Sequence, residues 1–151
     1  VSKALTVNFL PSTAEYPGYP YGGLGIFNDF QGINFSLVYA TNYGAAWGLF
    51  SDHQLILLAA RIAMIIGLTV YTLVFNRNRA YDFPLALIIV GATCNVIDYF
   101  IYGHVVDMFK FVFWGYHYPV FNVADSAICV GVFWFILASW VSAKDENSKE
   151  A

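Results

Sequence analysis

The amino-acid sequence predicts a mainly α-helical membrane protein that carries a small β-sheet outside the membrane. Three observations predict this class. Of the 151 residues, 59% are hydrophobic and only 11% are charged, whereas soluble domains carry about 25% charged residues. Three apolar segments have close to the roughly 20 residues that cross a bilayer core. One further segment alternates apolar and polar side chains with the period of a β-strand.

The apolar segments give both the expected spans and their orientation. The spans cover residues 55–75, 83–102 and 127–143. Arg77 and Arg79 lie between the first two spans, and Lys144 and Lys149 follow the third. Cytoplasmic connections are enriched in Lys and Arg, so both regions are expected to be cytoplasmic.

The two longer connecting segments, 1–54 and 103–126, are then extracytoplasmic. Because this topology also places residue 1 outside, we expect an initial span whose end is the short apolar stretch VSKALTVNFL. The expected architecture is a four-helix transmembrane bundle, seen as three complete spans plus the end of the first, with a small extracytoplasmic β-sheet cradle. The whole chain, 1–151, is expected to form a single membrane-embedded domain.

The extracytoplasmic segments contain the expected strand. Residues 11–25 are rich in Pro, Gly and Tyr and are expected to form an irregular loop. Residues 33–39 alternate in a period of two, which is typical of a half-buried strand. A lone strand in lipid would leave its edges unsatisfied, so the strand is expected in a small sheet at the membrane surface. Trp47 and Phe50 are typical of the aromatic belt at a membrane interface.

Acidic and amide residues stand in or against the last two spans. An aspartate at a bilayer centre costs roughly 2.5 to 3.5 kcal/mol on insertion scales, so such residues usually have a function. The residues are Asn95, Asp98, Asp107, Asn122 and Asp125. Taken singly, two structural explanations remain open. Asp125, expected just before the last helix, can cap free backbone amides, and Asn95 and Asp98, three residues apart on one helix face, can form an interhelical hydrogen bond.

Together, the three carboxylates indicate catalysis at the outer membrane face. Two carboxylates in a site that excludes water cannot both ionise cheaply, so they share a proton and provide one general base and one general acid. This pair suits the attack of water on a peptide carbonyl, as in aspartic proteases. Ser126 has no neighbouring His or Lys to activate it. The residues alone do not decide which two of the three carboxylates act.

Other classes of function fit the sequence less well. Cys94 and Cys129 lack metal-ligand spacing, so neither a metal nor another cofactor is expected. The net charge of −3, without a basic stripe, argues against nucleic-acid binding. The main alternative is a non-enzymatic membrane subunit or a proton-coupled transporter with aspartates as a relay, but a relay needs carboxylates spread through the bilayer depth. A structural protein with Asn and Asp between its helices leaves Asp107 unexplained.

Several motifs resemble those of a known family. GATCNVID, GHVVDMF and FNVADSAICVG, together with TNYGAAWGLF and the initial SK, resemble the lipoprotein signal peptidases (signal peptidase II). These are four-span aspartic peptidases of the bacterial cytoplasmic (inner) membrane. The resemblance implies that diacylglyceryl-modified prolipoproteins are the substrates and that cleavage occurs just before the lipidated cysteine, near the extracytoplasmic face. It implies no cofactor, and membrane lipid as a partner. A monomer would suffice for the chemistry, because one chain supplies both aspartates.

The resemblance also implies roles for individual residues. The family's catalytic pair falls on Asp107 and Asp125. Positions that support the site or contact the substrate fall on Lys3, Asn42, Asn95, Asp98 and Asn122. His104 lies beside the GHVVD motif as a neighbour, not as a catalyst.

The sequence departs from the family pattern at two places. The N-x-x-D motif usually continues with arginine, whereas this chain has Tyr99. Either another cation, such as Lys3 or Arg61, takes that place, or the role of the arginine is not essential. The interval from Lys3 to Asn42 is longer than is usual in the family, which indicates an insertion within residues 11–31.

Overall fold

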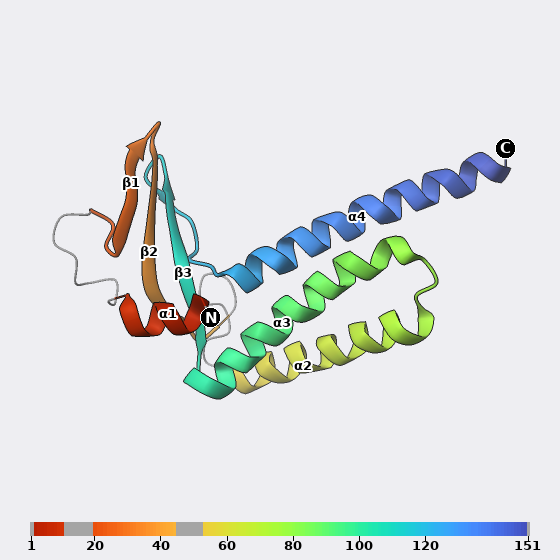
Figure 1. Ribbon diagram of the computed structural model, residues 1–151, viewed down its shortest axis with the longest axis horizontal. Coiled ribbons are helices and arrows are strands. Elements are labelled where there is room, and N and C mark those ends of the chain that lie inside the picture. Colours follow the sequence, from red (N-terminus) through yellow and green to blue (C-terminus); the bar gives the residue numbers. More distant parts are fainter. Residues whose placement is uncertain (1, 11–19, 45–52, 151) are drawn as a thin grey trace. The chain divides into compact units, whose positions relative to one another are not determined.

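The computed structural model describes residues 2–10, 20–44 and 53–150. Its helices are α1 (Ser2–Phe9), α2 (Gln54–Val70), α3 (Asp82–Tyr102) and α4 (Val123–Glu150). Its strands are β1 (Leu24–Phe30), β2 (Ile33–Asn42), β3 (Val105–Phe113) and β4 (Tyr116–His117). Figure 1 shows these elements.

The chain divides into two compact units. The first, here called the sheet unit, comprises Val1–Leu57 and Ile97–Val123. The second, the helical unit, comprises Leu58–Val96 and Ala124–Ala151. The end of α3 therefore belongs to the sheet unit and the rest of α3 to the helical unit.

The expected apolar segments form helices long and apolar enough to cross a membrane. These helices cover Gln54–Phe75, Arg79–Tyr102 and Val123–Lys144, which confirms the prediction of a mainly helical, multi-pass membrane protein. A helix suits lipid because it satisfies its backbone hydrogen bonds internally. One boundary differs from the prediction. Since α4 begins at Val123, four residues before the expected span, Asp125 lies within its first turn and not before it.

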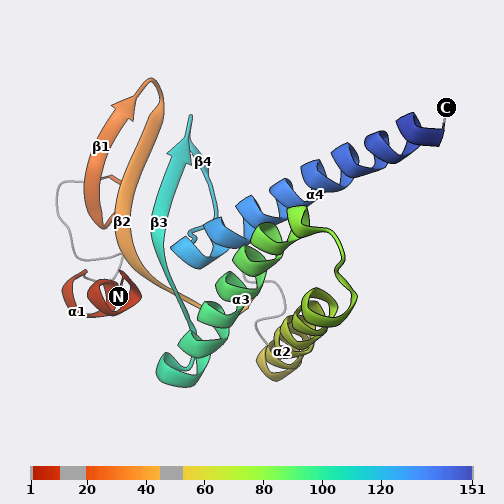
Figure 2. The same cartoon turned by 45° about the vertical axis from the view of Figure 1, so that its right-hand side comes forward.

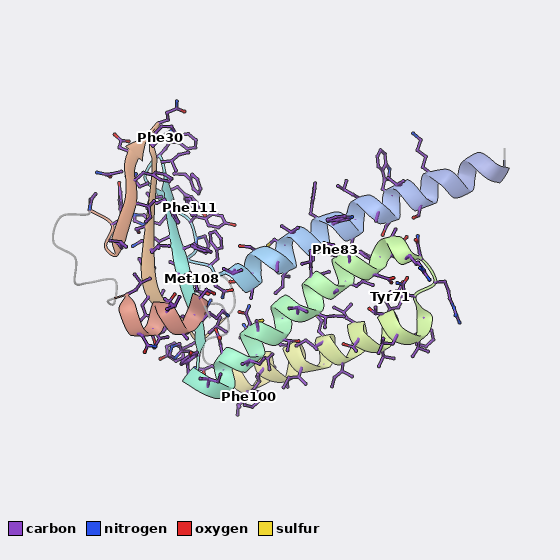
Figure 3. All side chains as sticks on the ribbon, viewed as in Figure 1. Phe30, Tyr71, Phe83, Phe100, Met108 and Phe111 are labelled. Atoms are coloured by element: carbon purple, nitrogen blue, oxygen red, sulfur yellow. The ribbon has the colours of Figure 1, made fainter. Side chains whose placement is uncertain are left out.

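Within the helical unit, α3 and α4 approach closely at two glycines. A Cβ atom at Gly91 would lie 2.6 Å from the carbonyl oxygen of Ala124, and one at Gly131 would lie 2.8 Å from that of Pro84. Lipid provides no hydrophobic drive between helices, so small residues that allow close packing are the usual basis of such contacts. Farther along the two helices, the rings of Phe83, labelled in Figure 3, and Trp134 pack 5.1 Å apart.

The close approach at Gly91 makes a testable prediction. We expect Gly91→Ala to lower the free energy of unfolding by about 1 to 3 kcal/mol, the usual cost of overpacking. Gly67→Ala is the matched control, because Gly67 also lies in a helix but a Cβ there meets nothing within 4 Å. At Gly67, the helix propensity of Ala leaves stability unchanged or raises it by up to about 1 kcal/mol. Thermal unfolding in detergent measures both, and equal unfolding temperatures would contradict the packing.

The connection between α2 and α3 is held by asparagine side chains. Asn78 accepts a hydrogen bond from the backbone N–H of Ala80 at 3.0 Å and donates one to Ser142 of α4 at 2.9 Å. Asn76 donates to Asp82, the first residue of α3, at 2.7 Å. These bonds satisfy the polar groups where the chain reverses direction between two apolar helices.

In the sheet unit, four strands form an antiparallel sheet in the order β1-β2-β3-β4. Figure 2 shows the four strands side by side. The expected strand at 33–39 is part of β2, which confirms the prediction of a small sheet. A β-bulge interrupts the pairing of β2 with β3 between Leu37 and Ala40, directly before the pair Ala40 and Asp107. Bulges re-aim side chains and are frequent beside active sites.

One face of the sheet is covered by the chain's own segments. On β2 the buried side chains are Asn34, Ser36 and Val38, whereas the apolar side chains that alternate with them are only half-buried. Thr6 of α1 contacts Met108 on this face, and Lys110 donates a hydrogen bond to the carbonyl oxygen of Tyr21. Burial lowers the pKa of the Lys110 ammonium. The polar face of β2 is therefore the inner one.

The opposite face of the sheet is aromatic. The rings of Phe35 and Phe111 stack with centroids 4.4 Å apart, and Phe121 packs against Phe109 and Phe111 at 5.5 Å and 6.0 Å. Figure 3 labels Phe111 partway along β3. Because side chains alternate along a strand, Asp107 projects from the same face as Phe109 and Phe111. The Asp107 carboxylate therefore lies on the aromatic face of the sheet, two residues before Phe109 on β3.

Candidate active site

Asp107 is a buried carboxylate whose two oxygens both accept hydrogen bonds from amides. Its exposed fraction is 2%. Asn122 donates from Nδ2 to Oδ1 at 2.7 Å, and Asn42 donates from Nδ2 to Oδ2 at 3.0 Å. The Asn42 side chain is itself oriented, because its Oδ1 accepts from the backbone N–H of Gly44 at 3.0 Å. Three of the residues singled out in the sequence thus form one cluster in the sheet unit.

The sheet register places Asn42 in this cluster. In the antiparallel ladder, Ala40 pairs with Asp107 and Asn42 pairs with Val105. Directly paired residues project from the same face, as do residues two apart along a strand. The amide of Asn42 therefore lies diagonally across the ladder from Asp107, within reach of its carboxylate.

The backbone after β4 places Asn122. The carbonyl oxygen of Phe121 accepts from the backbone N–H groups of Met108 and Phe109 at 3.0 Å and 2.8 Å, and the N–H of Phe121 donates to the oxygen of Phe109 at 3.2 Å. These bonds hold the segment against the edge of β3 that also pairs with β4. Asn122, which is completely buried, follows at once and directs its amide to Asp107.

The two amide donors hold the Asp107 carboxylate in a fixed orientation. Burial disfavours a charge, but hydrogen bonds donated to a carboxylate stabilise it. Both oxygens of Asp107 accept such a bond, Oδ1 from Asn122 and Oδ2 from Asn42. The arrangement suits a general base that is oriented before a substrate arrives.

Asp98 forms a buried ion pair with Lys3. The Lys3 Nζ atom lies 2.7 Å from Asp98 Oδ2, with side-chain exposures of 13% and 6%. The same oxygen accepts from the backbone N–H of Val106 at 2.9 Å. Asp98, near the end of α3, thus binds both α1, through Lys3, and the start of β3, through Val106. Val106 directly precedes Asp107 in the chain. Lys3 places a cation beside the N-x-x-D motif, which Tyr99 follows in this chain.

Asn95 and Asp125 form a second polar pair, in the helical unit. Asn95 on α3 donates from Nδ2 to Asp125 Oδ1 on α4 at 2.8 Å. The interhelical hydrogen bond expected from Asn95 is therefore present, with Asp125 as its acceptor. Asn95 and Asp98 share a motif but have different partners, because Asp98 bonds to Lys3 and Val106.

The expected site residues therefore fall into three groups of contacts. The sheet unit contains two of the groups, Lys3 with Asp98 and Asn42 with Asp107 and Asn122. The helical unit contains the third, Asn95 with Asp125. The sequence did not indicate Val106, whose backbone N–H binds Asp98, because a backbone contact leaves no mark on residue type. Within residues 2–10, 20–44 and 53–150, no group of three or more His, Cys, Asp and Glu residues could hold a metal ion.

Comparison with solved structures supports the fold. A bacterial membrane enzyme determined at 2.3 Å by the in meso method superposes with a TM-score of 0.75 at 24% identity, over 95% of this chain and 81% of that chain. A second, determined at 1.9 Å, superposes with a TM-score of 0.70 at 25% identity, over 91% of this chain and 81% of that chain.

Comparison with sequences shows the family. The family described as Signal peptidase (SPase) II matches residues 1–141. A lipoprotein signal peptidase of Haemophilus influenzae is 41% identical over 78% of this chain and 74% of that protein. One of Clostridium acetobutylicum is 39% identical over 75% of this chain and 73% of that protein. The chain therefore belongs to the signal peptidase II family, as its motifs predicted.

Proposed function

We propose that this protein is an aspartic endopeptidase that removes the signal peptide from diacylglyceryl-modified prolipoproteins, with cleavage just before the lipidated cysteine. Family membership and the name of the curated relatives, lipoprotein signal peptidase, support the substrate class. The observation that carries the aspartic chemistry is the Asp107 carboxylate, which is buried and accepts amide hydrogen bonds on both oxygens.

Asp107 and Asp125 are the catalytic pair in this proposal. Asp107 acts first as the general base and takes a proton from a water molecule, whose oxygen forms a bond to the scissile carbonyl carbon. Asp125 starts protonated and gives its proton to the carbonyl oxygen. The C–N bond of the resulting diol then breaks. The proton held by Asp107 passes to the leaving nitrogen, and one of the two hydroxyl groups of the diol gives its proton back to Asp125. The products are a carboxyl group and a free amine.

The FNVAD motif supports the pairing of these two residues. Asn122, which donates to Asp107, stands three residues before Asp125 in the same short segment. Asn95 donates to Asp125 and orients its carboxyl group. The proposal assigns the role of orienting the two catalytic carboxylates to Asn42, Asn95 and Asn122. It assigns the role of holding the backbone beside Asp107 to Lys3 and Asp98.

The membrane placement completes the proposal. The protein lies in the cytoplasmic (inner) membrane as one domain, with the connection that contains Arg77 and Arg79 in the cytoplasm. The sheet and Asp107 then lie at the extracytoplasmic face, where the scissile bond of a membrane-anchored precursor is accessible without extraction of its lipid. A monomer suffices, because one chain carries both carboxylates. The fourth span expected from the sequence stays a prediction.

Two precursor peptides test the substrate class. They share one sequence, but only one carries diacylglycerol on its cysteine. We expect the purified protein in detergent to cut the lipidated peptide and to leave the other uncut, as chromatography of the products would show. Equal cleavage of both would contradict the assigned substrate, and an intact lipidated peptide would favour a non-enzymatic protein.

Asn122→Ala tests the support of Asp107. A hydrogen bond to a charged group contributes about 1.5 to 3 kcal/mol, so we expect kcat to fall about 10- to 100-fold. Asn76→Ala is the control, because Asn76 also bonds to an aspartate, Asp82, but in the connection between α2 and α3. We expect the control to retain the parent kcat. An unchanged kcat in Asn122→Ala would show that its amide does not serve the reaction.

A further inference from the structure

A second polar contact crosses between β2 and the chain that leads to Asp107. The Tyr39 hydroxyl and the Nε2 atom of His104 lie 2.9 Å apart. Tyr39 stands within the β-bulge of β2, between Leu37 and Ala40. His104 stands in the turn that joins α3 to β3, directly after Gly103, which has a φ of 76°.

This contact spans the part of the ladder that holds the Asn42 amide on Asp107. Tyr39 directly precedes Ala40, the partner of Asp107, and His104 directly precedes Val105, the partner of Asn42. The hydrogen bond therefore runs diagonally over both residue pairs. The β-bulge disrupts the regular backbone hydrogen bonds near the end of β2. The hydrogen bond between Tyr39 and His104 therefore restrains this end of the strand.

The surroundings keep Tyr39 a hydrogen-bond donor. Burial and the neighbouring Tyr43 and Tyr102 raise the pKa of the Tyr39 hydroxyl. It therefore remains protonated at neutral pH and shares a hydrogen bond with Nε2 of His104. The rings of Tyr43 and Tyr102 lie 5.4 Å and 6.3 Å from the His104 ring and enclose it within the sheet unit.

We propose that His104 is a positioning residue that, through Tyr39, braces the bulged end of β2 against the start of β3 and so keeps Asn42 on Asp107. His104 does not touch the reacting atoms in this account and transfers no proton. The effect on activity rests on the proposed function of Asp107, whereas the brace itself is a property of the sheet.

The kinetic test compares three single variants and one double variant. A neutral hydrogen bond contributes about 0.5 to 1.5 kcal/mol, so Tyr39→Phe and His104→Leu should each lower kcat about 2- to 10-fold, with KM unchanged. His104→Gln, whose side-chain amide can still form a hydrogen bond with the Tyr39 hydroxyl, should recover most of the parent kcat. Because the two residues act through one bond, the double variant Tyr39→Phe/His104→Leu should be no slower than the slower single variant.

Three kinetic results would overturn the proposal. A parent-like kcat in Tyr39→Phe would show that the hydroxyl is not needed. A kcat in His104→Gln as low as in His104→Leu would indicate that the imidazole acts chemically. Multiplied losses in the double variant would show two independent effects.

Hydrogen exchange tests the brace without any substrate. Tyr39→Phe should accelerate exchange of the backbone amides at 40–42, while His104→Gln leaves it as in the parent. The amides of Phe109 and Phe111, farther along the ladder, are the internal control and should not change. Unchanged exchange at 40–42 in Tyr39→Phe would overturn the brace. If the parent cuts no substrate, the proposed function fails, and exchange still decides the inference about His104.

Discussion

Replacement of Asp107 or Asp125 by asparagine is expected to abolish cleavage, with kcat lowered by at least about a thousandfold. General acid and base groups contribute roughly 10²- to 10⁴-fold each, and asparagine neither takes nor gives a proton at neutral pH. The two residues act as a pair, so the double variant Asp107→Asn/Asp125→Asn should be no slower than either single variant. Cleavage rates at saturating lipidated peptide measure all three.

The controls for this prediction separate chemistry from folding. Asp29→Asn changes an exposed aspartate of the same unit, and its φ of 52° suits asparagine equally well. We expect this variant to cut like the parent. At position 107 the new amide meets two amide donors, so the unfolding temperature is measured with the rate. A folded Asp107→Asn or Asp125→Asn variant that still cuts would refute the catalytic pair.

Lys3→Met is expected to lower the free energy of unfolding by about 3 to 5 kcal/mol, the usual effect of breaking a buried ion pair. The change leaves the Asp98 carboxylate, 6% exposed, without its ammonium partner. The variant is expected to lose activity as well, because Asp98 also holds the Val106 N–H, next to Asp107. Unfolding in denaturant with detergent measures the effect.

The double variant Lys3→Met/Asp98→Asn is expected to be more stable than Lys3→Met alone. It removes both charges, and the asparagine carbonyl still accepts from the Val106 N–H. Lys144→Met, an exposed lysine on α4, is the control and should change stability by less than about 0.5 kcal/mol. If Lys3→Met is no less stable than this control, the ion pair does not support the fold.

The helices were predictable because a chain in a bilayer core must satisfy its backbone hydrogen bonds internally. A run of apolar residues such as 83–102 has few structures open to it in a bilayer, and α3 covers Asp82–Tyr102. The alternation at 33–39 predicted β2, but not which face the protein covers. The buried side chains of that alternation include the polar Asn34 and Ser36, whereas the apolar ones beside them are only half-buried. Strand β1 was not predicted, because two register shifts interrupt its pairing with β2.

The candidate site was predictable in its residue types but not in its contacts. An aspartate in FNVAD beside an apolar run indicates function, and the sequence placed Asp125 just ahead of the helix, where capping was one of the roles left open. The helix instead begins at Val123, and Asp125 accepts from Asn95. The bond between Tyr39 and His104 joins residues 65 positions apart. No local pattern encodes such a pair, since it depends on the register of β2 with β3.

The masses of the products formed from a diacylglyceryl-modified prolipoprotein show whether this protein is the proposed endopeptidase and where it cuts. The purified protein in lipid vesicles is incubated with the precursor, beside the Asp107→Asn variant. We expect two products from the parent, a signal peptide and a mature fragment that begins at the lipidated cysteine with a free α-amino group, and none from the variant. An intact precursor, cleavage at another bond, or the same products from a folded Asp107→Asn variant would contradict the proposed function.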